Sequence, residues 1–317
     1  MKKVLVFTDG KAGHENQSKA FARALGCTCD VVEIHFKSKL AKAASYLLDR
    51  LGIRAFGLLS AAVDEATLRS AGYAAVVGTG SGTFYAVKTM ARKLGVRGGV
   101  VLYPRGYRIG GFDCILAPAF DNPAKMSNVI EIPANLVAND ESFYTKGVEA
   151  FKAHWLASSG ETFSDPENAV AVIVGGPNKC STLTSAWMKT QLEKVFAENP
   201  GASVWVTTSR RTPPEVEAVV DSYPFAYKLL YSKDHFNPIP AFVKLAKRLY
   251  VTAESTGMLS EACTFGSAEV KALDNLKAGP HKFRRFVENL EGEGYVNGTR
   301  KVDLTAQFAA AKRLMGL

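Results

Sequence analysis

The chain has 317 residues, of which 47% are hydrophobic and 22% are charged, and its formal net charge is +9. This composition is typical of a folded globular protein and excludes a disordered or low-complexity chain. At roughly 150 residues per domain, the length fits two α/β domains. The positive charge favours anionic partners such as nucleotide phosphates or anionic lipid. Because no nucleic-acid-binding motif accompanies the dispersed basic residues, we expect no nucleic acid partner.

The five cysteines and five histidines are scattered along the chain. An odd number of cysteines without the spacing of a zinc site predicts free thiols, a reducing cytoplasm and no metal site. The amino terminus lacks the apolar core of a signal peptide. No apolar stretch approaches the roughly 18 to 20 residues that a membrane-spanning helix needs. We therefore expect a cytoplasmic protein, with at most a peripheral contact at the inner face of a membrane.

The first half of the sequence alternates between short apolar runs and amphipathic segments. Buried strands are predicted at residues 4–7, 30–34, 74–77, 99–103, 112–118 and 128–132. Helical patterns at residues 17–25, 40–51 and 84–94 follow the first three of them. This alternation predicts a parallel sheet with right-handed crossovers. The loops 9–14 and 78–82 contain glycine and lead into helices. Free amides at these helix starts can hold an anion; the alternative is that each glycine loop is simply the turn between a strand and a helix.

The helical pattern at residues 40–51 is basic as well as apolar. Its apolar side contains Leu40, Ala44, Leu47, Leu48 and Leu51. The cations around that side are Lys37, Lys39, Lys42 and Arg50. The more common interpretation is a helix whose apolar side faces the core. The alternative is a helix that rests on an anionic membrane, where each Lys or Arg adds roughly 1 kcal/mol.

A linker is expected at residues 158–166, which divides the chain into domains at 1–160 and 161–317. In the second domain, apolar runs at residues 169–174, 203–207, 226–230 and 248–252 predict buried strands. The alanine-rich segment 303–314 predicts a terminal helix with one face that docks on the protein.

Glycine, hydroxyl and arginine residues follow the strands of the second domain, at the carboxyl ends where open α/β sheets bind ligands. They are Gly175, Gly176, Ser209, Arg210, Arg211, Thr252, Ser255 and Ser260. Glycines permit close approach of the backbone, a helix behind them contributes roughly 0.3 to 1 kcal/mol to anion binding, and arginine holds phosphate with two hydrogen bonds. This combination predicts a site for a nucleoside diphosphate.

Glu261 lies one turn into the helix that follows the last of these loops. There a carboxylate can accept both hydroxyls of a ribose, at about 1.5 to 3 kcal/mol for each bond. The alternative is an ordinary solvent-facing glutamate. Neither the dinucleotide fingerprint nor the phosphate loop ending in Gly-Lys-Ser/Thr is present.

Six stretches of the chain resemble the elongated-mitochondria, or mitochondrial fission, family of GT-B-type glycosyltransferases, which has many bacterial members. They are Asp9 to Gln17, Phe112-Asp113 with Pro118 and Asp121, Gly175 to Lys179, Thr208 to Pro213, Asn237-Pro238, and Thr252 to Ala262. The resemblance therefore covers nearly the whole chain. Gly13-His14 and residues 255–261 are also similar to the peptidoglycan N-acetylglucosaminyltransferase, another GT-B enzyme.

The resemblance implies a GT-B-like α/β fold, in which two Rossmann-like domains with parallel sheets face each other across a cleft and a C-terminal helix docks back. It implies sugar transfer from a nucleotide-sugar donor, expected to be UDP-linked, without a metal or other cofactor. The implied donor-binding residues are Gly175, Gly176, Ser209, Arg210, Arg211, Asn237, Thr252, Glu254, Ser255, Met258, Ser260 and Glu261. On the acceptor side they are Gly13, Asn16, Gln17, Thr79 and Ser81.

For the catalytic base, His14 and Asp9 are the candidates in the first loop. We prefer His14, because an ordinary histidine pKa of about 6.5 suits a base at neutral pH; the alternative is a structural loop histidine. The chain departs from the family at Gly78 to Gly82, where members often carry Gly-Arg-Arg, and at Phe120, where they carry histidine. Both departures lie on the acceptor side.

Two other functions remain open from the sequence. A nucleotide-sugar 2-epimerase would need several carboxylates or histidines around the sugar, in which the loops are poor. A non-catalytic adaptor is the second, because plant members of the family are associated with organelle fission through recruitment of a dynamin-like protein. The acceptor is unidentified; a lipid-linked or envelope saccharide is expected only on the strength of the basic segment at residues 37–59.

Overall fold

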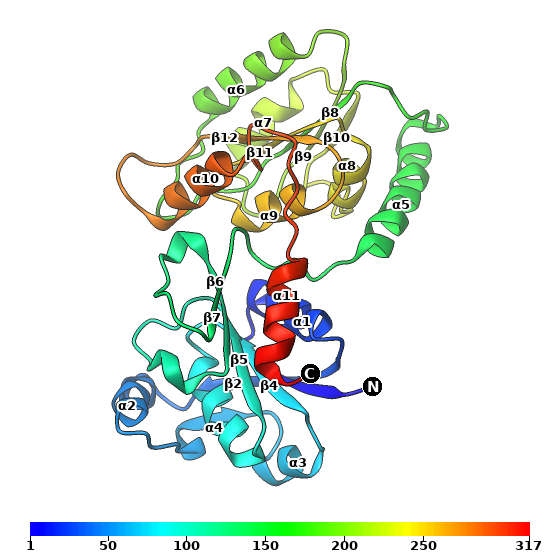
Figure 1. Cartoon of the computed structure of the whole chain (residues 1–317). Helices are drawn as coiled ribbons and strands as arrows, with labels where there is room; N and C mark the ends of the chain where they lie inside the picture. Colours follow the sequence, from blue (N-terminus) through cyan, green and yellow to red (C-terminus); the bar gives the residue numbers. More distant parts are fainter. The chain divides into compact units, whose positions relative to one another are not determined.

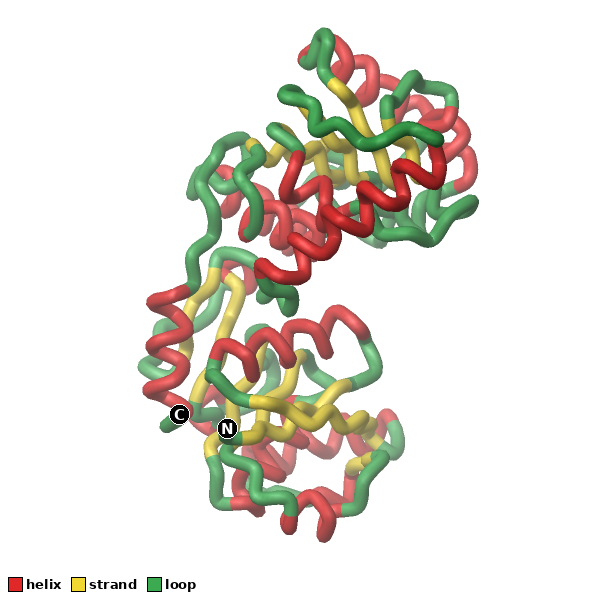
Figure 2. Tube along the Cα trace, turned by 90° about the vertical axis from the view of Figure 1, so that its right-hand side faces the viewer, coloured by secondary structure: helices red, strands yellow, loops and turns green.

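The computed structural model describes all 317 residues, which form two α/β units. Unit 1 comprises Met1–Ala138 and Asp303–Leu317, and unit 2 comprises Asn139–Val302. In each unit, helices cover the two faces of a central sheet (Figures 1 and 2). The expected pair of Rossmann-like domains is therefore confirmed.

The sheet of unit 1 has seven strands in the order β3-β2-β1-β4-β5-β6-β7. Their bounds are β1 (Lys3–Thr8), β2 (Thr28–Phe36), β3 (Leu59–Ala61), β4 (Ala75–Thr79), β5 (Arg97–Val101), β6 (Cys114–Pro118) and β7 (Val129–Ile132). The prediction of a wholly parallel sheet is wrong at one edge, because β3 pairs antiparallel with β2. A strand of three residues is too short to produce a periodic pattern in the sequence.

Five helices cover this sheet: α1 (Ala12–Ala24), α2 (Lys39–Arg50), α3 (Glu65–Ser70), α4 (Phe84–Leu94) and α11 (Thr305–Met315). Short 3₁₀ turns lie at Phe56–Leu58, Ile109–Gly111 and Ala119–Asp121. The terminal helix α11 docks on β5, β6 and β7, as expected. A Cβ on Gly99 of β5 would lie 2.8 Å from Phe21 and 3.0 Å from Met315. Glycine there lets α1 and α11 pack directly on the strand.

The sheet of unit 2 is fully parallel, with five strands in the order β10-β9-β8-β11-β12. They are β8 (Ala169–Ile173), β9 (Ser203–Thr207), β10 (Tyr227–Leu229), β11 (Arg248–Thr252) and β12 (Glu269–Leu273). The helices are α5 (Glu141–Ser159), α6 (Ser185–Glu198), α7 (Pro214–Asp221), α8 (Ile239–Leu245), α9 (Thr256–Thr264) and α10 (Lys282–Gly292). Strand β12 and helix α10 were not predicted.

The division into units differs from the boundary expected at residue 160. Helix α5 belongs to unit 2, where it packs on α8 and where Gly147 lies against Pro240. Phe151 of the same helix is fully buried among aromatic rings that include Trp205 and Phe242. Gly160, interpreted as part of a linker, is the left-handed cap that ends α5. The carboxyl-terminal segment from Asp303 returns to unit 1.

Each sheet has a point at which the chain changes direction along the strand order. In unit 1 it lies between β1 and β4, and in unit 2 between β8 and β11. Open α/β sheets bind ligands beyond the carboxyl ends of such neighbouring strands. The loops after these four strands therefore define the two candidate sites. No helix is both long and apolar enough to cross a membrane.

Candidate functional site

A glycine pair joins three loops at the carboxyl edge of unit 2. The backbone amide of Gly175 donates to Thr252 Oγ1 at 2.8 Å. A Cβ on Gly175 would lie only 2.0 Å from Ser255 Oγ, and one on Gly176 only 2.3 Å from the carbonyl oxygen of Arg211. The β8 loop can therefore lie directly between the loops after β9 and β11 only because both residues lack a side chain.

We predict that Gly176→Ala leaves unit 2 folded but displaces the arginine loop. The obstacle is the backbone of Arg211, which cannot rotate away as a side chain would. A hydrogen bond from a charged group contributes about 1.5 to 3 kcal/mol, so loss of one arginine contact should weaken the affinity for the proposed nucleotide ligand roughly 10- to 100-fold in titration calorimetry. Gly292→Ala is the matched control, since a Cβ there meets nothing within 4 Å. Unchanged affinity in Gly176→Ala would contradict the prediction.

The loop after β9 carries two arginines, and hydrogen bonds of Thr212 stabilise its backbone. Thr212 Oγ1 donates to the carbonyl oxygen of Gly175 at 2.6 Å and accepts the amide of Ser209 at 2.9 Å. The side chains of Arg210 and Arg211 are exposed, and neither takes part in an ion pair or side-chain hydrogen bond. Two guanidinium groups are therefore free to bind an anion beside the glycine pair.

The helix that offers amides to an anion is α9, and not the helix after the glycine pair. Helix α6 begins only at Ser185, and Thr184 Oγ1 already accepts the amide of Trp187. Helix α9 has no side-chain cap, and the amides of its first three residues, beginning with Thr256, form no hydrogen bond. Because α9 follows β11, its start lies next to Gly175. The expected helix-dipole contribution is thus reassigned from α6 to α9.

Four residues expected to face the donor instead hold the β11 loop in shape. Glu254 is 3% exposed, and its Oε1 accepts from Thr252 at 3.1 Å and from Ser255 at 3.0 Å. Its Oε2 accepts from Asn275 at 2.7 Å. Ser260 is fully buried and donates to the carbonyl of Thr256 at 2.7 Å. A buried carboxylate requires several hydrogen-bond donors, and Thr252, Ser255 and Asn275 supply them to Glu254. These side chains therefore stabilise the loop and are not directed at a ligand.

The two remaining expected donor residues lie at helix starts. Met258 is half-buried on the first turn of α9, beside the free amides. Asn237 accepts the amide of Ile239, the first residue of α8, at 3.2 Å. None of its hydrogen bonds reaches the glycine or arginine loops. The structure thus brings together the loops after β8, β9 and β11, whereas Asn237 serves α8.

Glu261 has one committed and one free carboxylate oxygen. Tyr144 donates to its Oε1 at 2.9 Å, and its Oε2 accepts no hydrogen bond. Burial raises the pKa of Glu261, and the bond from Tyr144 only partly offsets this. Tyr144 is fully buried and stacks on Phe265 just beyond the end of α9, with ring centroids 4.3 Å apart. Glu261 is therefore held in place and is not a freely solvated glutamate.

A pocket of about 520 Å³ adjoins the arginine loop. It is lined by Ser209, Arg210 and Thr212 from that loop, by Glu217 of α7, and by Tyr231 and Lys233 after β10. Its volume falls within the range of small-molecule sites, roughly 300 to 1,000 Å³. Elsewhere, no group of three or more His, Cys, Asp or Glu side chains gathers as a metal ion would require.

In unit 1, Asp9 and His14 form a hydrogen-bonded pair at the end of β1. His14 Nδ1 lies 2.9 Å from Asp9 Oδ1, and Lys11 Nζ lies 2.7 Å from Asp9 Oδ2. Burial alone would raise the pKa of Asp9, but the bonds and charges of Lys11 and His14 outweigh it and lower that pKa. A Cβ on Gly80 would lie 2.5 Å from the His14 ring, and one on Gly82 2.7 Å from Asp9. The glycine loop after β4 therefore makes room for the pair.

Thr79 and Ser81, the expected acceptor-side residues of that loop, already have partners. Thr79 is fully buried, and its hydroxyl shares a hydrogen bond of 2.7 Å with Ser18 of α1. Ser81 is exposed and accepts from Lys42 Nζ of α2 at 3.0 Å. Thr79 is thus a packing residue, whereas Ser81 remains at the surface.

The three expected residues of α1 differ in accessibility. Gly13 and Asn16 are exposed on the first turns of the helix. Gln17 is half-buried, and its Oε1 is buried without a hydrogen-bond partner. The start of α1 has no side-chain cap. In unit 1 the structure therefore groups Asp9 and His14 with the exposed start of α1.

A family model described as "Mitochondrial fission ELM1" matches residues 12–313 of the chain. The chain belongs to the mitochondrial fission ELM1 family. Four of the six stretches that carry the resemblance lie at the β1, β8, β9 and β11 loops, which form the two candidate sites. Among curated protein sequences, none matches this ELM1-family chain significantly.

Solved structures share the fold at low sequence identity. The UDP-GlcNAc 2-epimerase of Neisseria meningitidis, bound to UDP-GlcNAc, is 12% identical with a TM-score of 0.53, over 100% of this chain and 98% of that one. The UDP-GlcNAc 2-epimerase of Methanocaldococcus jannaschii is 14% identical with a TM-score of 0.55, over 96% and 95%. At such identities the likeness establishes the fold alone, a GT-B-like pair of Rossmann-like domains.

Sequence reasoning missed three residues of the candidate site in unit 2. Thr212 bridges the arginine and glycine loops, and Tyr144 holds Glu261. Asn275, which follows β12, donates to Glu254, and its Oδ1 is buried without a partner. Thr212 belongs to a stretch already quoted for the family resemblance. The other two pair with residues 21 and 117 positions away, and one sequence carries no signal for such contacts.

Proposed function

We propose that this ELM1-family protein is a metal-independent glycosyltransferase, whose nucleotide-sugar donor binds to unit 2. One observation carries the proposal. The glycine pair seats the two unpaired arginines of the β9 loop and the uncapped start of α9 against the same short segment, with Glu261 further along α9. This is a set of groups suited to a nucleoside diphosphate.

The donor fits this arrangement in one direction. The diphosphate would accept from the first amides of α9 and from Arg210 and Arg211. Glu261 lies five residues beyond Thr256, or about 7.5 Å along the helix axis at 1.5 Å per residue. Its free Oε2 would accept the ribose hydroxyls, while Tyr144 keeps the carboxylate oriented. We propose that the nucleobase attached to this ribose is uracil.

The same groups favour departure of the nucleotide. As the bond from the sugar to the diphosphate breaks, negative charge grows on the leaving oxygen. Arg210, Arg211 and the α9 amides would stabilise that charge, which is the task a metal ion performs in other transferases. In unit 1, His14 would accept the proton of the attacking acceptor hydroxyl. A lipid-linked or envelope saccharide is the acceptor we propose.

The test is a thermal-shift screen of the purified protein against UDP, GDP, CDP, dTDP and their sugars. A ligand at 100 times its dissociation constant adds roughly 2.7 kcal/mol of stability. We expect a shift with UDP and its sugars that Glu261→Ala and Arg210→Ala abolish. Arg285→Ala on α10 is an arginine control for the same unit. No shift with any nucleotide, or an equal loss in the control, would overturn the proposal.

Product analysis separates the proposal from its two rivals. A transferase releases the nucleoside diphosphate, an epimerase returns an isomeric nucleotide sugar, and an adaptor leaves the donor unchanged. The adaptor is retained as a second candidate because the family description names mitochondrial fission. For an adaptor, Glu261→Ala would leave partner binding intact.

A further inference from the structure

Helix α2 buries two polar residues and exposes three leucines, unlike an ordinary surface helix. The residues it buries are Ser45 and Asp49. The side chains it exposes are Leu40, Leu47 and Leu51, at 82%, 60% and 64%. The core-facing interpretation is therefore wrong for Leu40, Leu47 and Leu51, which form the exposed leucine stripe, whereas Leu48 and Tyr46 of the same helix pack on the core of unit 1. Ordinary surface helices bury such a stripe.

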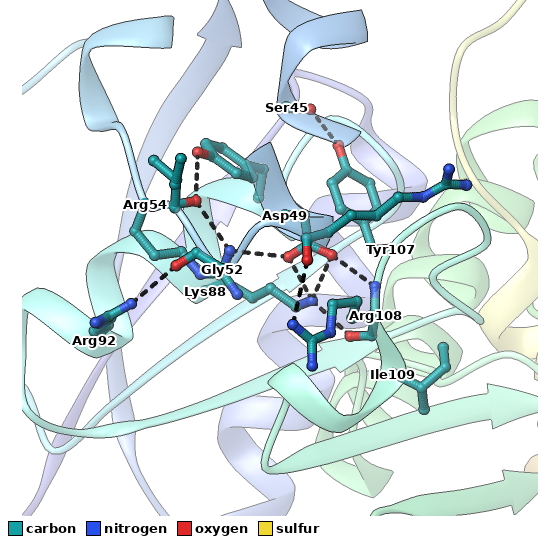
Figure 3. A network of polar contacts seen from close by, with 12 residues as sticks. Ser45, Asp49, Gly52, Arg54, Lys88, Arg92, Tyr107, Arg108 and Ile109 are labelled. Atoms are coloured by element: carbon teal, nitrogen blue, oxygen red, sulfur yellow. Dashed lines mark hydrogen bonds and ion pairs between the residues drawn. The ribbon is translucent and has the colours of Figure 1, made fainter. Parts of the chain in front are cut away.

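A polar network fixes the inner face of α2 to unit 1 (Figure 3). Asp49 accepts from Lys88 Nζ at 2.8 Å and from the amide of Arg108 at 2.6 Å, and Arg54 pairs with it at 3.1 Å. Ser45 shares a hydrogen bond of 2.9 Å with Tyr107. These contacts hold α2 in one orientation, so the leucine stripe remains exposed.

Cations surround the leucine stripe, and the segment that contains it, residues 37–59, has no exposed acidic residue. Residues 37–59 contain one acidic residue, the buried Asp49. Lys37, Lys39 and Arg50 are exposed around the helix. Two further exposed arginines reach its end from other elements: Arg108 donates to the carbonyl of Arg50 and Arg92 to that of Gly52. Ile53, 47% exposed, extends the apolar surface there.

We propose that the outer face of α2, with Ile53, docks on an anionic lipid surface. Apolar side chains would enter the interface between headgroups and acyl chains, and the surrounding cations would contact acidic headgroups. Charge complementarity selects this occupant over a second copy of the chain, because two copies would bring the same cations together. The proposal stands on α2 and does not depend on sugar transfer.

Helix α2 lies close to the candidate site in unit 1. Lys42 of α2 donates to Ser81 in the glycine loop, and that loop packs against Asp9 and His14. A membrane held by α2 would therefore lie beside the proposed acceptor side, where a lipid-linked acceptor is presented.

Flotation of the full-length protein with vesicles tests this. We expect binding to phosphatidylglycerol-containing vesicles, weakening with salt, and none to pure phosphatidylcholine. Lys39→Gln and Arg50→Gln should each weaken partitioning about five-fold. Leu47→Glu with Leu51→Glu should abolish it. Leu156→Glu on α5, where Leu156 is 50% exposed, is the matched control and should have no effect.

Four outcomes would overturn the proposal: no binding to anionic vesicles, equal binding to neutral ones, loss of binding in Leu156→Glu, or a dimer in size-exclusion chromatography that the Leu47 and Leu51 changes convert to monomer. The last would assign the face to a second copy. Leu40→Glu, at the most exposed of the leucines, repeats the test with little risk to folding. Nucleotide-induced thermal shifts should be unchanged in every α2 variant, which separates failure of this proposal from failure of the transferase proposal.

Discussion

Replacing Asp49 with alanine is expected to destabilise unit 1 by about 3 to 5 kcal/mol, because it leaves the buried Lys88 without its counter-charge. Asp49 is fully buried, and the side chain of Lys88 is 1% exposed. Besides Asp49, only the carbonyl of Arg108, at 2.6 Å, accepts from Lys88. Arg54, whose side chain is 14% exposed, can turn to water when Asp49 is lost. Lys88 cannot.

Urea unfolding followed by circular dichroism measures this loss. The three tryptophans, Trp155, Trp187 and Trp205, all lie in unit 2, so their fluorescence reports that unit and serves as an internal reference. The double variant Asp49→Leu with Lys88→Met removes both charges and should recover most of the stability. A loss of less than about 1 kcal/mol in Asp49→Ala would contradict the importance given to this pair.

The loss should depend on pH in a defined direction. Burial lowers the pKa of Lys88 to about 8, and Asp49 offsets only part of that effect. Between about 8 and the ordinary value of 10.5, the unfolded chain keeps a proton that the folded protein gives up, so stability rises with pH across this window. Lys88→Met should lack this rise. The deficit of Asp49→Ala should shrink above pH 8, since a neutral Lys88 needs no partner.

The α2 network shows what one sequence cannot reveal about a helix. The spacing of Leu40, Leu47 and Leu51 correctly indicates one face, but it does not say whether that face meets the core. The answer depends on Asp49 and on Lys88, which lies 39 residues further on. Strands β1, β4, β8 and β9 were predicted because buried parallel strands are continuous apolar runs. Strand β12, Glu269–Leu273, has a glutamate and a lysine in its run and was missed.

The candidate donor site was predictable as a set of loops but not as a set of contacts. Strand order and glycine content locate the β8, β9 and β11 loops at one edge. Which hydroxyls face a ligand depends on competition inside the protein: Glu254 takes those of Thr252 and Ser255. Likewise, a glycine pair suggests a helix start directly behind it, whereas the uncapped helix belongs to the next strand of the sheet. Side-chain competition of this kind leaves no periodic signal.

Replacing His14 with alanine is expected to reduce the turnover number on the order of 10²- to 10⁴-fold, the usual contribution of a positioned general base. Because Asp9 is held ionised by its lowered pKa, it accepts the proton on His14 Nδ1. This fixes the tautomer in which Nε2 is the acceptor for the proton of an incoming hydroxyl. Nucleotide affinity should be unchanged in His14→Ala, since the proposed donor-binding groups all belong to unit 2.

A pH profile distinguishes a base from a structural histidine. In the wild type, kcat/KM for the donor identified by thermal shift should fall toward acid pH, because a protonated histidine cannot act as a base. His14→Ala should lose that acidic limb along with the rate. Asp9→Asn keeps the size of the side chain but removes its charge. The histidine can then adopt the other tautomer, with the proton on Nε2, so the rate should also fall in this variant. His35→Ala, at an exposed histidine of β2, is the control. A His14→Ala enzyme that keeps the acidic limb and loses less than about ten-fold in rate would assign the base elsewhere.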